Sequence, residues 1–200
     1  MKDLERRVYN VIEMRVEDED KEPRLRGHAA VFDSDSVEMW GFVERVAPGA
    51  FTRTLKEADN IHALWSHDSA LPLGSTRGGK LDLREDKVGL AFDLSGKRLN
   101  EAQLDAVRDG DMRMSFGFRT KAEKWEERKD MLPLRTLLDV DLFEISLVTM
   151  PAYPDTDVGV RSLAAWREQQ PNDADEQVAA AQAAAYIELM TLTNRLARVL

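Results

Sequence analysis

The sequence of 200 residues contains no cysteine. This absence excludes disulfide bonds, thiolate nucleophiles and thiolate metal ligands, and it fits a reducing compartment. Long apolar runs are also missing, since no segment approaches the ~20 residues that a membrane-spanning helix needs. The charged N-terminus, MKDLERR, has no apolar stretch behind it, so we expect no signal peptide. Together these absences predict a soluble, intracellular protein.

Basic residues are also fewer than acidic ones. The chain has 28 Lys and Arg against 37 Asp and Glu, which gives a formal net charge of −9 and a pI near 5.0. An acidic chain without a basic run is poorly suited to a phosphate backbone, so we do not expect nucleic-acid binding as the main function. Hydrophobic residues make up 43% and charged residues 32%, which is ordinary for a globular protein with one core.

Short strand-like segments separated by turn residues dominate the first 160 positions. We expect strands at residues 7–16, 26–32, 42–46, 60–67, 81–83, 88–94, 112–118 and 134–148. Short helices are expected after Pro48 and from Asn100 to Val107, and solvated turns or loops at residues 17–20, 68–79 and 123–130. This pattern predicts a mainly β fold, an antiparallel β-barrel with flanking helices.

The composition changes after about residue 163. Residues 169–173 (QQPND) are typical of a linker, and residues 175–200 are rich in alanine with apolar side chains at helical spacing. We therefore divide the chain into a main domain, residues 1–163, and a linker with a C-terminal amphipathic helix, residues 164–200. The apolar stripe of that helix needs a partner, and we expect an intermolecular one.

Three apolar segments each contain a residue that can carry or accept a proton. They are WSHD at residues 65–68 with His67, MSFGF at 114–118 with Ser115, and DLFEISLV at 141–148 with Glu144. A buried polar group costs free energy unless it is paired. A histidine, a serine and a carboxylate can pair with one another, and together they form the machinery of a serine hydrolase.

Each candidate has a plainer interpretation. A strand serine such as Ser115 is more often bonded to solvent or backbone, and Arg113 replaces the first glycine of the Gly-x-Ser-x-Gly elbow, which disfavours an α/β-hydrolase. A lone histidine is more often structural, but His67 lies at a strand end before a loop, where active-site residues concentrate. The other histidines, His28 and His62, are weaker candidates.

Glu144 either lies in a central strand and needs a partner or lies in an edge strand and faces water. Asp139 and Asp141 compete with it as the acidic member. The sequence indicates no cofactor or metal. Residues 74–80 (GSTRGGK) have the glycine–lysine spacing of a phosphate-binding loop, but Leu81 stands where Ser or Thr would bind Mg²⁺. Three histidines at these spacings form no known metal-ligand pattern.

The order of these segments resembles the prohead (capsid-maturation) proteases of tailed bacteriophages. The resemblance extends from about Gly27 to Asp155. It rests on the order and spacing of several short pieces, which are GHAAVF at 27–32, FVE at 42–44, PGAF at 48–51, HD at 67–68, LG at 73–74, SFGF at 115–118, EISLVT at 144–149 and PA at 151–152.

The resemblance implies a fold like that of the herpesvirus assembly proteases, an antiparallel β-barrel wrapped by helices. It implies Ser115 as nucleophile, His67 as general base and Glu144 as third member. The herpesvirus enzymes use a second histidine in the third role, but no histidine follows His67 here, so a carboxylate or a plain dyad remains.

The implied activity is that of a serine endopeptidase without a cofactor. It would cleave the major capsid protein in its scaffolding region, and often itself, inside the assembling prohead in the host cytoplasm, with neither nucleic acid nor membrane as partner. A non-catalytic capsid assembly or scaffolding protein on the same fold is the alternative, and an esterase is a weaker one.

Overall fold

The structure is a computed structural model that describes residues 4–9, 14–19, 22–39, 41–149 and 157–169. Chain contacts divide it into one unit that ends at Arg161 and a second that begins at Ser162. The last described element, α3 (Asp157–Glu168), crosses this division. The helix expected over residues 175–200 lies outside the described residues, and both it and the domain boundary near residue 163 stay predictions.

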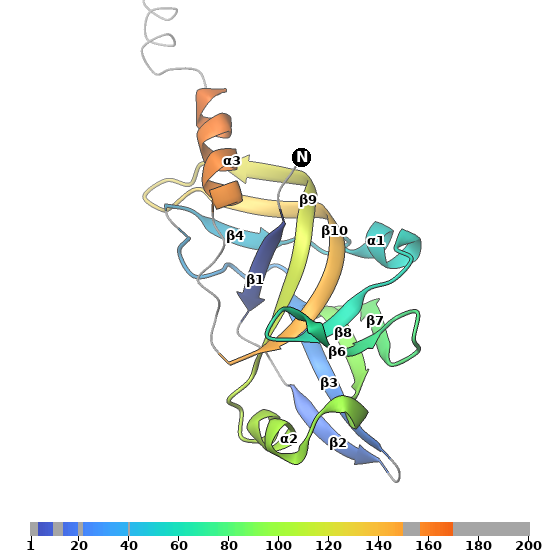
Figure 1. Ribbon diagram of the computed structural model, residues 1–200. Coiled ribbons are helices and arrows are strands. Elements are labelled where there is room, and N and C mark those ends of the chain that lie inside the picture. Colours follow the sequence, from blue (N-terminus) through green and yellow to red (C-terminus); the bar gives the residue numbers. More distant parts are fainter. Residues whose placement is uncertain (1–3, 10–13, 20–21, 40, 150–156, 170–200) are drawn as a thin grey trace, which may run out of the picture. The chain divides into compact units, whose positions relative to one another are not determined.

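The larger of two sheets carries the candidate residues. Among the described residues it has six strands, in the order β1-β9-β10-β5-β6, with β4 paired to the first part of β10. Their bounds are β1 (Glu5–Tyr9), β4 (Val43–Val46), β5 (His62–Trp65), β6 (Asp68–Ser75), β9 (Arg113–Glu126) and β10 (Leu134–Val148). The long strands β9 and β10 run side by side (Figure 1). Pairing is antiparallel except where β10 meets β4 and β5.

The second sheet is antiparallel throughout and has the order β2-β3-β8-β7. Its strands are β2 (Arg15–Glu19), β3 (Glu22–Val31), β7 (Leu81–Glu85) and β8 (Gly89–Ser95). A core of buried side chains joins the two sheets, with Leu25 and Phe92 from this sheet and Phe116 and Phe118 from β9. Because side chains alternate along a strand, the opposite face of β9 presents Ser115 and Gly117.

Before α3, the part of the chain that the structure describes has three short helical segments. They are α1 (Thr52–Glu57), the 3₁₀ turn η1 (Gly96–Arg98) and α2 (Glu101–Arg108). Helix α2 begins as predicted, because the Asn100 side chain accepts a hydrogen bond from the Gln103 backbone N–H and Gln103 bonds back to the backbone of Asn100. The predicted β7–β8 hairpin is also confirmed.

The mainly β class is confirmed, but the described strands pair as two open sheets and give no closed barrel. Several local expectations were wrong. Residues 7–16 contribute to two strands in different sheets, the acidic residues expected as a turn belong partly to β2, residues 68–75 form β6, and β9 continues to Glu126. At residues 17–19 and 68–75, strand pairing overrode low intrinsic strand propensity.

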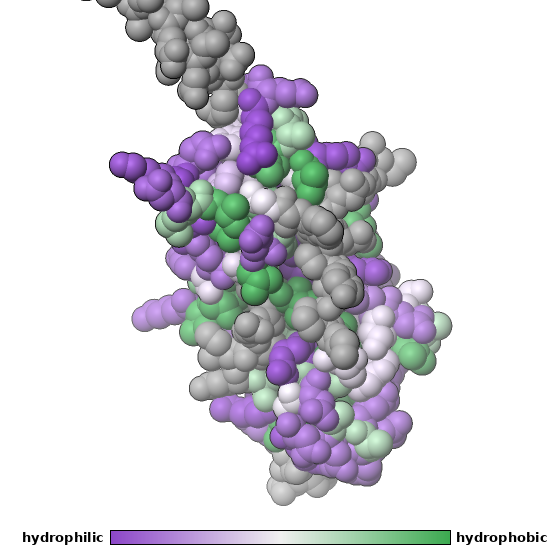
Figure 2. All heavy atoms as spheres, turned by 90° about the vertical axis from the view of Figure 1, so that its left-hand side faces the viewer, coloured by the Kyte–Doolittle hydropathy of each residue, from purple (hydrophilic) through white to green (hydrophobic). Residues whose placement is uncertain are grey.

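The face shown in Figure 2 is mostly hydrophilic, with hydrophobic side chains interspersed among charged ones. Isolated apolar residues on a surface are normal for globular proteins. No helix among the described residues is both long enough and apolar enough to cross a membrane.

Candidate active site

His67 lies in a two-residue hairpin turn between β5 and β6. Trp65 pairs with Asp68, so Ser66 and His67 form the loop, with φ angles of 52° and 59°. Positive φ at both central positions is the geometry of a type I′ turn, which usually contains Asn-Gly. Residues with a Cβ are disfavoured there by about 1–2 kcal/mol each. The fold therefore holds His67 in a backbone conformation that its own preferences oppose.

Hydrogen bonds to the end of β10 stabilise this turn. The Ser66 backbone N–H donates to the Leu147 carbonyl at 2.8 Å, and the His67 backbone N–H donates to Ser146 Oγ at 2.8 Å. The Ser146 hydroxyl in turn donates to the Leu64 carbonyl at 3.2 Å. Ser146 thus links the backbone of the turn to β10 and β5.

The His67 ring is bonded to Glu144. Its Nδ1 lies 2.7 Å from Glu144 Oε1, and the two side chains are only 8% and 10% exposed. Glu144 is therefore no solvated edge-strand charge. A carboxylate at Nδ1 favours the tautomer with its proton on that nitrogen, which leaves the Nε2 lone pair free to accept another.

Ser115 lies on the same face of the sheet as Glu144. It is opposite Ser146 in the β9–β10 register, and Gly117 is opposite Glu144. Ser115 is fully buried. The turn that carries His67 is bonded to Ser146, the cross-strand neighbour of Ser115. The structure thus brings His67 and Glu144 into contact and places Ser115 on the same face of the sheet, opposite Ser146.

Buried polar atoms without a hydrogen-bond partner cluster on this face of the sheet. Among the described residues, the buried side-chain nitrogen and oxygen atoms without a hydrogen-bond partner are Arg6 Nε, His67 Nε2, Ser115 Oγ and Glu144 Oε2. Such atoms are rare because each costs free energy. Their concentration beside the His67–Glu144 pair indicates a functional site, where a proton donor and acceptor are kept available.

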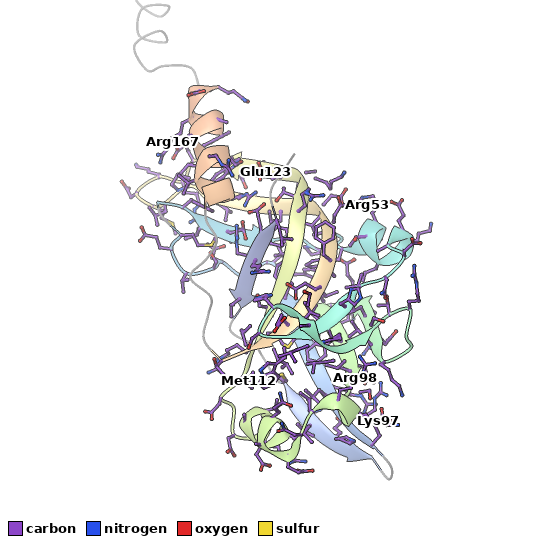
Figure 3. All side chains as sticks on the ribbon, in the orientation of Figure 1. Arg53, Lys97, Arg98, Met112, Glu123 and Arg167 are labelled. Atoms are coloured by element: carbon purple, nitrogen blue, oxygen red, sulfur yellow. The ribbon has the colours of Figure 1, made fainter. Side chains whose placement is uncertain are left out.

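The competing carboxylates are held elsewhere. Arg53 on α1, labelled in Figure 3, donates to Asp139 Oδ2 at 2.9 Å and to Asp141 Oδ1 at 2.7 Å. Burial by itself raises the pKa of Asp141, but the Arg53 hydrogen bond and the nearby Lys121 charge outweigh it and hold that pKa below its ordinary value. The acidic residue in contact with His67 is Glu144.

The other two histidines lie apart from this pair. His28 Nε2 is 2.9 Å from Asp86 Oδ2 in the second sheet. His62 is exposed, and its Nε2 lies 3.1 Å from Asn60 Nδ2. Among the described residues, no group of three or more His, Cys, Asp or Glu side chains is placed to hold a metal ion.

Sequence reasoning missed three residues of the site. A Cβ at Gly117 would lie 2.4 Å from Glu144 Oε1, so the carboxylate occupies the space that a larger residue would fill. Ser146 could have been found, since it lies two positions from Glu144 and shares its strand face. Arg6, whose Nε is 4.0 Å from Glu144 Oε1, gave no signal among the charges of the N-terminus.

Comparison with known proteins gives a family match. The sequence model of the family described as caudovirus prohead serine protease matches residues 10–169, most of the chain, and this span includes His67, Ser115 and Glu144. No curated protein and no solved structure matches the chain. The extent of the family match shows that the chain belongs to the caudovirus prohead serine proteases.

Proposed function

We propose that this chain is a serine endopeptidase of prohead maturation, with Ser115 as nucleophile, His67 as general base and Glu144 as third member. The observation that carries the proposal is the buried hydrogen bond between His67 Nδ1 and Glu144 Oε1. The opposite ring nitrogen and Ser115 Oγ, in the same part of the sheet, are both buried and without a partner. Family membership supports the same reaction class.

The chemistry follows from these atoms. As Ser115 Oγ attacks the carbonyl carbon of the scissile peptide bond, His67 Nε2 accepts the hydroxyl proton. Glu144 holds the Nδ1 proton and stabilises the imidazolium that forms. The imidazolium then protonates the leaving amine, and an acyl ester remains on Ser115. Water hydrolyses the ester with His67 again acting as base.

The proposed substrate is the major capsid protein in its scaffolding region, and the enzyme itself is a second substrate. The site of action is the interior of the assembling prohead in the host cytoplasm. An acidic protein of formal charge −9 suits a protein substrate better than the DNA that later fills the shell.

One observation favours the alternative, a non-catalytic assembly protein on the same fold. Ser115 has no exposed surface, so a peptide carbonyl reaches its Oγ only after the covering atoms move. If they never move, the serine is structural.

Cleavage of the capsid protein separates these functions. The chain is produced together with the major capsid protein, and the products are identified by mass spectrometry. Ser115→Ala should lower cleavage about a thousandfold or more, because the nucleophile is lost. Ser69→Ala, at an exposed position in β6, is the matched control and should cleave like the wild type.

Cleavage by Ser115→Ala at the wild-type rate would contradict the proposal. Capsid assembly that needs the chain while the wild type cleaves nothing would support the non-catalytic alternative.

A further inference from the structure

Edge strand β1 brings an arginine to the candidate site. Arg6 pairs with Gly117 on β9, and Gly117 pairs with Glu144 on β10. The three residues form one row across three strands on the Ser115 face. Because Gly117 has no side chain, Arg6 and Glu144 approach each other across it, and Arg6 Nε lies 4.0 Å from Glu144 Oε1.

Both side chains of this row have hydrogen-bonding capacity left over. Arg6 Nε is a buried donor without a partner, and Glu144 Oε2 is a buried acceptor without a partner. The Arg6 side chain as a whole is 37% exposed. Among the described residues, the basic side chains within 4.0 Å of the Glu144 carboxylate are Arg6 and His67.

A buried carboxylate needs a positive counter-charge. At Glu144 that charge comes either from a protonated His67 or from Arg6. A guanidinium is charged at every physiological pH, whereas an imidazole that has taken up a proton can no longer act as a base. The permanent charge of Arg6 can therefore balance the Glu144 carboxylate without an added proton on His67.

We propose that Arg6 is a positioning residue that supplies the counter-charge of Glu144 and so keeps His67 neutral and available as a base. This inference rests on the proposed function for its catalytic meaning. Arg6 precedes the span that matches the family, residues 10–169. The N-terminal strand thus completes, from outside that span, a site whose other members lie inside it.

Other charged groups lie near the pair in sequence or in strand register. Asp68 follows His67 in the turn, and His62 on β5 is in register with Glu144. Arg119 on β9 is in register with Asp141, and its guanidinium lies 5.2 Å from the centre of the Phe143 ring. All four titratable or charged groups are retained in variants at position 6, so a difference between those variants reports on Arg6.

The test is a pH titration of the histidine rings by NMR in the wild type, Arg6→Gln and Arg6→Lys. The chain has three histidines, so His28 and His62 serve as internal controls for folding. In Arg6→Gln the His67 ring should take up its proton at a higher pH than in the wild type, because the opposing charge is gone. Arg6→Lys keeps the charge and should restore most of the difference.

Activity provides the second measurement. The acidic limb of the pH–rate profile for peptide cleavage should move to higher pH in Arg6→Gln and return in Arg6→Lys. Arg45→Gln, which removes an arginine of similar exposure paired with Asp35, should leave the profile unchanged. If Arg6→Gln is unfolded by the His28 and His62 signals, Arg6→Met, which keeps the apolar stem, replaces it.

An unchanged or lower titration pH of His67 in the folded Arg6 variant would overturn the inference. A uniform loss of activity at every pH, without a shift of the limb, would do the same by assigning Arg6 a merely structural role. The ring titration needs no enzymatic activity. Failure of the wild type to cleave therefore counts against the proposed function, whereas the effect of Arg6 on His67 is decided by the titration alone.

Discussion

The described residues contain two histidine–carboxylate pairs, one beside the larger sheet and one beside the smaller sheet. His67 and Glu144 lie 2.7 Å apart in the larger sheet, and His28 and Asp86 lie 2.9 Å apart in the smaller one. By distance alone they are nearly equivalent. Their exposures differ, since the side chains of the first pair are 8% and 10% exposed and those of the second 18% and 36%.

The two carboxylates differ most in what else they bind. Asp86 also accepts hydrogen bonds from the backbone N–H groups of Val88 and Gly89, at 2.8 and 3.0 Å, so it organises the β7–β8 turn. Burial raises its pKa, but the bonds from His28 and from this backbone outweigh that effect and lower it. Glu144 has one oxygen unused. Unmet hydrogen bonds, rather than the pair itself, distinguish a candidate active site from a structural contact.

Substitution of each histidine by alanine tests this comparison and should give the largest effect. His67→Ala should reduce cleavage about a thousandfold or more, because the general base is lost. His28→Ala should stay within about threefold of the wild type, since a surface contact away from the reaction is lost. Rates are measured on a peptide that spans the capsid cleavage site. Equal losses in the two variants would show that the pairs do not differ in function.

The carboxylates give a smaller contrast. Glu144→Gln keeps the shape but loses the charge that stabilises the imidazolium, and we expect a loss of about a hundredfold in kcat. Asp86→Asn should leave kcat unchanged. Asp141→Asn, a change in the carboxylate bound to Arg53, is a second control. A loss in Asp141→Asn larger than that in Glu144→Gln would transfer the third role to Asp141.

A glycine lies next to each of these carboxylates, and substitution of the two glycines by alanine should have different consequences. A Cβ at Gly117 would meet the movable Glu144 side chain at 2.4 Å, whereas a Cβ at Gly89 would meet the Ala30 backbone oxygen at 1.9 Å. Gly117→Ala should therefore fold, lose about 1 kcal/mol of stability and lose roughly tenfold in activity as Glu144 is displaced from His67. Gly89→Ala should prevent stable folding. Thermal unfolding and cleavage rates check both, and a fully active Gly117→Ala would contradict the geometry of the row.

The smallest expected effect is the pH-dependent stability that Asp86 contributes. Its pKa is lower in the folded chain than in the unfolded one, so its contribution is complete above the ordinary carboxyl pKa, about 4, and is lost as the pH falls through the folded value. Solvent screening limits it to a few tenths of a kcal/mol. Urea unfolding should show Asp86→Asn less stable than the wild type at pH 7, with the difference narrowing as the pH falls below about 4. A gap independent of pH would remove the ionic explanation.

Candidate residues were easier to predict from the sequence than their arrangement in space. His67, Ser115 and Glu144 each break an apolar segment, and that pattern is local and visible. The contact between His67 and Glu144 depends on the parallel pairing of β5 with β10, which no local pattern encodes. The same limit explains why Asp141 remained a rival until its bond to Arg53 was seen.

The fold was predicted at the level of class and in its most regular parts. The β7–β8 hairpin and the Asn100 cap have local signals, whereas β6 does not. Its residues, DSALPLGS, are typical of a turn, and they become a strand because β5 offers a pairing partner across the Ser66–His67 loop. The positions of Arg6 and Gly117 beside Glu144 can be recognised only from the register of three strands.

Covalent labelling by a fluorophosphonate tests the central claim most directly, because the reagent forms a stable adduct with an activated serine. We predict one adduct in the wild type and in His28→Ala, mapped by mass spectrometry to Ser115. Labelling should fall at least about a hundredfold in His67→Ala and disappear from that peptide in Ser115→Ala. An adduct on another serine, or labelling of Ser115 that is insensitive to the loss of His67, would contradict the account.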